Sequence, residues 1–304
     1  MRVFVTGASG WIGSAVVPEL IGAGHEVTGL ARSDASAAAL AATGAAVLRG
    51  TLDDLDLLGE AAAGSDGVVH LAFKHDIAFS GDYEGAARAD RLAVETFGDA
   101  LAGSGRPLVI ASGTLGVAPG RLATEQDGHG EMPGEGPAAR HATAEHALSL
   151  AAQDVRSCVL RLPPTVHGDG DNGFMATLVG IARAAGVSGY VGDGANRWPA
   201  VHRFDAARLF RLAAESAPAG STLHAVAEEG VPVREIAETI GRHLDVPAAA
   251  AAPEHFSFLA RFIGVDCPAS SAFTRELLGW EPAGPGLIED LDLGHYFRPA
   301  SAAR

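Results

Sequence analysis

The chain has 304 residues, of which 47% are hydrophobic and 19% are charged, a composition typical of a folded globular protein. This length allows one large domain or two smaller ones. The formal net charge of −15 argues against the basic surface that nucleic-acid binding requires, so we expect no nucleic-acid partner.

Two further features bear on where the chain works. It has no apolar run of about eighteen residues, so we expect no membrane span and no membrane partner, and its first apolar run is too short for a secretory signal. Its two cysteines, Cys158 and Cys267, lie far apart, and its histidines show no zinc-like spacing. These features predict a reduced, cytoplasmic protein without a metal site.

The first elements of the chain surround a run of glycines. Residues 1–5 predict a buried strand, residues 14–21 continue at helical period, and residues 26–31 predict a second strand. Between the first strand and the helix the glycines let the chain turn, let the backbone approach a ligand, and let the helix pack against the sheet. The N-terminus of the helix offers free N–H groups to a pyrophosphate. This stretch therefore predicts a dinucleotide site, with cofactor contacts from Gly7, Ser9, Gly10, Trp11, Ile12 and Gly13.

The end of the second strand is where such folds meet the adenosine ribose. An acidic residue there would bind the 2′-hydroxyl of NAD, but this chain has Arg32 followed by Ser33. An arginine beside a hydroxyl suits the 2′-phosphate of NADP, with a solvated surface arginine as the alternative. We therefore expect NADP as the cofactor, with Leu52 near its adenine ring after a third strand at residues 45–48.

Strand and helix patterns continue to alternate, which predicts an α/β fold with a doubly wound parallel sheet of the Rossmann type. Further strands are predicted at residues 67–73, 108–111 and 155–162, helices at 83–101 and 138–153, and a loop or lid at 116–137. Beyond these, the pattern predicts helices at 174–185, 205–214 and 231–244, an extended piece at 197–202, and a linker turn at 248–252.

This organisation predicts two domains. A dinucleotide-binding domain is expected at residues 1–165 and a smaller, mostly helical substrate domain at residues 166–304, with a segment near 195–207 returning to the first. Because open α/β sheets bind ligands at the carboxyl ends of their strands, the expected rim includes Leu71, Ala72, Phe73, Lys74, His75, Asp76, Ser112 and Thr114.

Several stretches together resemble the short-chain dehydrogenase/reductase superfamily, in its extended or atypical branch of epimerase/dehydratase-like proteins. They are the nucleotide motif at 6–13, the fourth-strand motif at 69–72, and similar segments at 161–168, 198–202, 205–207 and 278–282. The resemblance implies that Pro163, Thr165 and Val166 lie beside the nicotinamide. It also implies a homodimer through the helices at 83–101 and 138–153.

The chain departs from this superfamily at the catalytic pair, Tyr-x-x-x-Lys. The three tyrosines, Tyr83, Tyr190 and Tyr296, have no lysine four residues further on. Arg140 stands where the tyrosine is expected and Ala144 where the lysine is expected. The hydroxyl of the fifth strand survives as Thr114, or alternatively as Ser112. Standard chemistry of the superfamily therefore does not follow from the resemblance.

Other side chains are candidates for the missing proton donor. Lys74 or His75 could act as an acid or donor with Asp76 orienting it, or the three residues could form a solvated loop. His141 shares a helix face with Glu145, which fits either catalysis or an exposed ion pair. Substrate contacts are expected from Asp76, His167, Tyr190, Trp198 and His202, with turn capping or core packing as the alternatives for the last four.

The sequence thus predicts an NADP-dependent reductase of small carbonyl or imine compounds. An imine arrives already protonated and demands less of the protein than a ketone, which needs a donor for the developing alkoxide. The alternatives are a nucleotide-sugar epimerase or dehydratase that retains NAD, and a redox sensor that binds NADP(H) without catalysis.

Overall fold

A computed structural model describes residues 1–128 and 135–298, apart from the side chains of Phe79 and of residues 135–138. Its centre is a seven-stranded sheet with the strand order β10-β6-β5-β4-β1-β2-β3, and every neighbouring pair in it is parallel. The strands are β1 (Arg2–Thr6), β2 (Glu26–Ala31), β3 (Ala46–Arg49), β4 (Gly67–His70), β5 (Pro107–Gly113), β6 (Arg156–Leu162) and β10 (Ser221–His224). The predicted doubly wound parallel sheet is confirmed.

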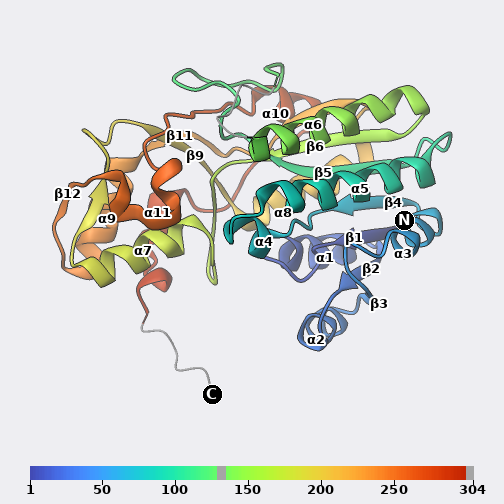
Figure 1. The fold of residues 1–304 in the computed structure, drawn as a ribbon, viewed down its shortest axis with the longest axis horizontal. Helices are drawn as coiled ribbons and strands as arrows, with labels where there is room; N and C mark the ends of the chain where they lie inside the picture. The colour runs from blue at the N-terminus through green and yellow to red at the C-terminus, as the bar shows by residue number, and fades with distance from the viewer. Residues whose placement is uncertain (129–134, 299–304) are drawn as a thin grey trace.

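Helices cover both faces of this sheet (Figure 1). Along β1, Val3 and Val5 pack in one hydrophobic cluster, whereas Phe4 packs in another, because successive side chains of a strand point to opposite faces. The first cluster contains residues of α1 (Gly13–Gly22), α2 (Asp34–Ala42) and α8 (Arg203–Ser216). The second contains residues of α3 (Leu55–Ala63), α5 (Tyr83–Leu101), α6 (Glu135–Ser149) and η1 (Leu150–Gln153).

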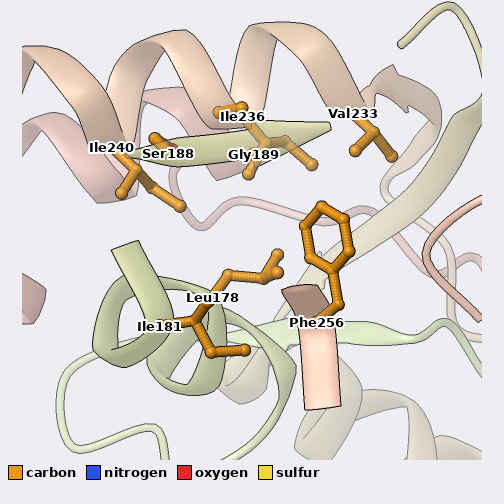
Figure 2. A pocket seen from close by; sticks show the side chains of 9 residues that line it. Leu178, Ile181, Ser188, Gly189, Val233, Ile236, Ile240 and Phe256 are labelled. Carbon is orange, nitrogen blue, oxygen red and sulfur yellow. The ribbon is translucent and has the colours of Figure 1, made fainter. Parts of the chain in front are cut away.

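A second, smaller body lies beyond one end of the sheet (Figure 1). It contains a three-stranded sheet and a two-stranded sheet, from β7 (Thr165–His167), β8 (Ser188–Tyr190), β9 (Arg197–His202), β11 (Glu228–Pro232) and β12 (Ala248–Ala250). Its helices are α7 (Phe174–Ala185), α9 (Val233–Leu244), η2 (Pro253–Arg261), α11 (Leu287–Asp292) and η3 (His295–Phe297). Helix α10 (Ala272–Leu278) instead packs against α8 and β10 of the larger body. In its core, Leu178 of α7 faces Ile236 of α9 and Phe256 (Figure 2).

Some predicted elements differ from the structure. The linker turn predicted at 248–252 is wrong, because residues 248–250 form β12, which pairs in parallel with β8. The predicted helix 231–244 begins only at Val233, since Val231 and Pro232 belong to β11. Residues 71–73 follow β4 without strand pairing, whereas α6 begins earlier than predicted. Residues 129–134 of the predicted lid lie outside the described residues.

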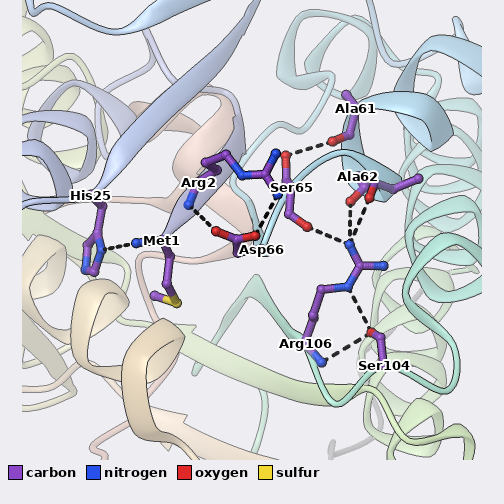
Figure 3. A network of polar contacts seen from close by, with 10 residues as sticks. Met1, Arg2, His25, Ala61, Ala62, Ser65, Asp66, Ser104 and Arg106 are labelled. Atoms are coloured by element: carbon purple, nitrogen blue, oxygen red, sulfur yellow. Dashed lines mark hydrogen bonds and ion pairs between the residues drawn. The ribbon is translucent and has the colours of Figure 1, made fainter.

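Polar contacts tie the loops at the amino ends of the strands (Figure 3). The Arg2 guanidinium lies 2.8 Å from the carboxylate of Asp66, just before β4. Arg106, just before β5, donates to the carbonyl oxygens of Ala63 and Ala100 at 3.0 Å. These contacts close the edge of the sheet opposite to the carboxyl ends of the strands. In the part of the chain that the structure describes, no helix is both long and apolar enough to cross a membrane.

Candidate functional site

A cleft of about 1040 Å³ opens at the carboxyl ends of the central strands. It lies where the strand order reverses, between β1 and β4, which is the position at which open α/β sheets bind ligands. The predicted residues that line it are Gly7, Ser9, Gly10, Trp11, Ile12, Gly13, Arg32, Leu52, Leu71, Ala72, Phe73, Lys74, His75, Asp76, Ser112, His141, Pro163, Thr165 and Val166.

The glycine turn at the floor of the cleft accepts no side chains at two of its positions. Gly7 has a φ of +65°, and a Cβ on it would lie 2.7 Å from the backbone nitrogen of Ala72. A Cβ on Gly13 would lie 2.1 Å from the carbonyl oxygen of Gly7. The first turn of α1 begins at Gly13 and carries no carboxylate. An anion approaching this helix end therefore meets N–H groups without repulsion, which fits the diphosphate of a dinucleotide.

Charged side chains line the end of the cleft beside β2 and β3. This end is named the adenosine end, because the sequence predicts the adenosine there. Arg32 follows β2, and its Nη1 lies 3.0 Å from Oδ2 of Asp76. Lys74 places its Nζ 2.6 Å from each carboxylate oxygen of Asp53. Ser33 instead caps α2, because its hydroxyl accepts the N–H of Ser36 at 3.2 Å. Ser36, which was not predicted, lines the cleft beside Arg32.

These ion pairs correct the prediction that Asp76 orients Lys74. The carboxylate of Asp76 engages Arg32, and the N–H of Ile77 also donates to it at 3.1 Å. Lys74 is held by Asp53. Lys74 and Asp76 therefore do not form a unit of proton donor and orienting group.

On the fifth strand, the structure separates the two candidate hydroxyls. Ser112 lines the cleft. Thr114 is buried, with 1% of its surface exposed, and its Oγ1 has no hydrogen-bond partner among the described residues. Ser112 is thus the hydroxyl that a ligand in the cleft can reach.

Arg140, which the resemblance predicts at the position of the superfamily's tyrosine, lines the cleft. Its guanidinium carbon lies 4.1 Å from the centroid of the Phe73 ring, which is a cation–π contact. Its Nε has no partner among the described residues. Burial by the surrounding protein, with repulsion from Arg140, lowers the pKa of His75 to about 4, so this imidazole is neutral at pH 7.

Beneath the residues that line the cleft, a buried chain of hydrogen bonds supports the backbone of Ala72. The Thr6 hydroxyl accepts the Ala72 N–H at 3.3 Å and lies 2.6 Å from Nδ1 of His70. Nε2 of His70 lies 3.1 Å from the carboxylate of Asp90. This arrangement fixes the backbone at the end of β4, which forms part of the cleft.

Four predicted substrate residues lie away from the cleft. Trp198 is fully buried and donates its indole N–H to the Val265 carbonyl at 3.2 Å, and Tyr190 packs in the core of the smaller body. His167 is fully buried 2.9 Å from the Asp290 carboxylate. His202 packs against the ring of His167. For Trp198 and Tyr190 the alternative of core packing therefore describes the structure better than substrate contact. His167 and His202 pack together outside the cleft lining, which differs from the predicted substrate contact.

The other end of the cleft, named the substrate end, is built from residues that the sequence did not predict. They come mainly from α7 and η2 with the turns around them, and comprise Leu115, Asp171, Asn172, Phe174, Met175, Phe258 and Phe262. The rings of Phe174 and Phe262 stack with centroids 5.8 Å apart. Asp171 accepts the Gly173 N–H at 2.6 Å and the Tyr296 hydroxyl at 3.1 Å, and burial raises the pKa of Asp171. The glycine-rich turn at 168–173 is the sequence feature that could have indicated this end of the cleft.

Comparison with known proteins independently supports the resemblance to the short-chain dehydrogenase/reductase superfamily. The model of the NAD-dependent epimerase/dehydratase family matches residues 3–226. An uncharacterized protein of Schizosaccharomyces pombe is 48% identical over 302 residues, which cover 98% of this chain and 100% of the relative. The 2-alkyl-3-oxoalkanoate reductase of Stenotrophomonas maltophilia is 28% identical over 317 residues, covering 100% of this chain and 93% of that enzyme.

A solved structure shares the fold. MoeE5 in complex with UDP-glucose and NAD superposes with a TM-score of 0.77 at 24% identity, covering 96% of both chains. The glycine turn, the parallel sheet and the match to the family model all agree with the resemblance that the sequence shows. The chain belongs to the NAD-dependent epimerase/dehydratase family, in the extended branch of the short-chain dehydrogenase/reductase superfamily.

Proposed function

We propose that this protein is an NADP-dependent reductase of small, largely apolar carbonyl or imine compounds, and that it works without the catalytic tyrosine. The observation that carries the proposal is the contrast between the two ends of one cleft. Arg32 stands at the adenosine end, whereas the substrate end is walled by Phe174, Phe258 and Phe262.

A nicotinamide cofactor, when bound, supplies the reducing equivalent that such a reaction needs. In this chain Gly7, Gly10 and the N-terminus of α1 would hold its diphosphate. Arg32, with Ser36 beside it, would hold a 2′-phosphate by charge-assisted hydrogen bonds. Val166, which lines the cleft and accepts the Trp11 indole N–H at 2.9 Å, would lie beside the nicotinamide.

The wall of the substrate end favours a small organic molecule over a sugar nucleotide. A sugar nucleotide needs cations for its diphosphate. Among the described residues that line the cleft, the lysine and arginines are Arg32, Lys74 and Arg140. Arg32 and Lys74 lie at the adenosine end and are paired with carboxylates. Phenylalanine side chains instead favour apolar ligands, which supports the reductase over the epimerase or dehydratase.

Hydrogen-bond donors that line the cleft include Arg140, Ser112, Tyr83 and Asn172. For the reaction itself, we assign Arg140 and Ser112 as the donors to a substrate oxygen or nitrogen. A guanidinium stays charged at every physiological pH, so Arg140 stabilises a developing negative charge by hydrogen bonding rather than by giving up a proton. Lys74 is held by Asp53, and neutral His75 is a poor acid at pH 7. The proton then comes from His141 or from water, and an iminium substrate needs none.

The named relative supports reduction of a carbonyl group. The enzyme of Stenotrophomonas maltophilia is named for a 3-oxoalkanoate, which is an oxo compound with an alkyl chain. The lining of this cleft suits a compound of that general kind, because apolar side chains surround a small set of hydrogen-bond donors.

Turnover assays test this proposal directly. Oxidation of NADPH and of NADH is followed at 340 nm with a panel of alkyl and aryl ketones, aldehydes and cyclic imines. We expect faster turnover with NADPH and with apolar substrates. Release or conversion of added UDP-glucose, with NAD retained by the protein, would instead favour the epimerase. Tight NADPH binding without turnover of any compound would favour the sensor.

A further inference from the structure

Two ion pairs cross the adenosine end of the cleft from the same short segment. Lys74 and Asp76 lie where the chain leaves β4 and enters α4 (His75–Phe79). Lys74 reaches Asp53, in the turn after β3, and Asp76 reaches Arg32, at the end of β2. The segment therefore connects the end of β4 to the ends of β2 and β3, across β1, which lies between them in the sheet.

The carboxylate of Asp76 is held on both of its oxygens. Oδ1 accepts the N–H of Ile77 at 3.1 Å, and Oδ2 accepts from Nη1 of Arg32 at 3.0 Å. These contacts, Arg32 first, lower the pKa of Asp76, so the group is ionised at neutral pH. Lys74, whose side chain is 20% exposed, anchors the backbone two residues earlier. The carboxylate is thus placed on the guanidinium rather than swinging freely in solvent.

A carboxylate on an arginine resembles a phosphate on an arginine, since both present oxygens to the same planar fork. NADPH would bring its 2′-phosphate to Arg32, where Asp76 already accepts a hydrogen bond. The two anions would then compete for one cation and repel each other. NADH carries a hydroxyl at that position, so it can bind while the Arg32–Asp76 pair stays intact.

We propose that Asp76 is a specificity-determining residue: its carboxylate occupies Arg32 in competition with the 2′-phosphate and so weakens binding of NADP(H), but not of NAD(H). This inference rests on the proposed function, because it takes Arg32 as the 2′-phosphate ligand. It assigns to Asp76 a role in choosing the cofactor rather than in contacting the substrate. The exposed position of both side chains, 68% for Arg32 and 58% for Asp76, limits the effect to that of a surface ion pair.

The variant Asp76→Asn tests the inference through coenzyme binding alone. Dissociation constants for NADPH and NADH are measured by titrating coenzyme fluorescence with the full chain. We expect Asp76→Asn to tighten NADPH binding by about 2- to 5-fold, the upper part of the range set by surface charge pairs, and to leave NADH binding nearly unchanged. In the Arg32→Ala background the same substitution should tighten NADPH binding less, because competition for the guanidinium is gone and only the repulsion between the two anions is relieved.

Asp56→Asn is the matched control. It removes the same charge from an exposed aspartate on the nearby helix α3. Equal tightening of NADPH in both variants would reduce the effect to net charge and overturn the role of Asp76. An unchanged ratio of the two dissociation constants in Asp76→Asn would overturn it as well.

The outcome for the wild type is separate from the outcome for the variant. A wild-type chain that binds NADH more tightly than NADPH would refute the proposed NADP preference. The inference about Asp76 would still stand if Asp76→Asn shifted the ratio toward NADPH. Binding of neither coenzyme would overturn both.

Discussion

Arg140 holds its guanidinium carbon 4.1 Å from the centroid of the Phe73 ring. The contact joins helix α6 to the segment that follows β4, and both residues line the cleft. A permanent cation thus lines the cleft on the helix where the resemblance predicts a tyrosine hydroxyl. Since a guanidinium donates hydrogen bonds but keeps its protons, Arg140 in the proposed function stabilises charge and does not donate a proton.

The first prediction concerns this cation. Replacing Arg140 with alanine should lower kcat by about 100-fold, the order found when a donor to a developing negative charge is removed. The KM for NADPH should change little, because Arg32 and the glycine turn hold the cofactor. Steady-state kinetics on the best carbonyl substrate measures both values. Arg88→Ala, which removes an exposed arginine from helix α5, serves as the control and should behave like the wild type.

The second prediction concerns pH. Burial, with repulsion from Arg140, lowers the pKa of His75 to about 4, so this group stays neutral as the pH rises from 5 to 9 and gains its proton only on acidification through about 4. The profile of kcat against pH should therefore keep its shape between 5 and 9 in a His75→Gln variant. Loss of an ionisation near pH 6.5 in that variant would show that His75 titrates in the working enzyme.

The nucleotide end of the cleft could be predicted because its determinants are local. Gly7, Gly10 and Gly13 occur within one turn between a strand and a helix, and the backbone requires glycine there for steric reasons that spacing alone reveals. Arg32 follows directly from the end of β2. In each case a short stretch of sequence fixes both the conformation and the position at the rim.

The substrate end could not be predicted because its residues meet only in the folded chain. Phe174 of α7 and Phe262, which follows η2, stack although 88 residues of the chain separate them. Likewise, Arg32 pairs with Asp76 across a separation of 44 residues. The strand β12 is three alanines long, and its pairing with β8 depends on tertiary context rather than on propensity. The sequence leaves the roles of Tyr190 and Trp198 open, because an aromatic side chain suits either a pocket or a core.

The third prediction tests stability without touching the cleft. Arg106 donates to the carbonyl oxygens of Ala63 and Ala100 and to the hydroxyl of Ser104, each at 3.0 Å. Arg106→Ala should lower the free energy of unfolding by about 1–3 kcal/mol, because it leaves partly buried carbonyls without donors. Urea unfolding measures this loss. Arg106→Lys, which keeps the charge but not the fork of donors, should lose less, and kcat should stay unchanged in both variants.

The last prediction uses two glycines of helix α1 that differ only in their surroundings. A Cβ at Gly13 would lie 2.1 Å from the Gly7 carbonyl oxygen, whereas one at Gly22 would have nothing within 4 Å. Gly13→Ala must push the glycine turn away from the helix, so we expect the affinity for NADPH to fall by at least about 10-fold, as misplacement of a binding group typically costs. Gly22→Ala, at the exposed end of the same helix, should keep that affinity and raise stability by up to about 1 kcal/mol, because alanine is the better helix former. Coenzyme titration and urea unfolding of the two variants separate binding from folding. If Gly13→Ala remained folded and bound NADPH as tightly as Gly22→Ala does, the diphosphate could not rest on this turn.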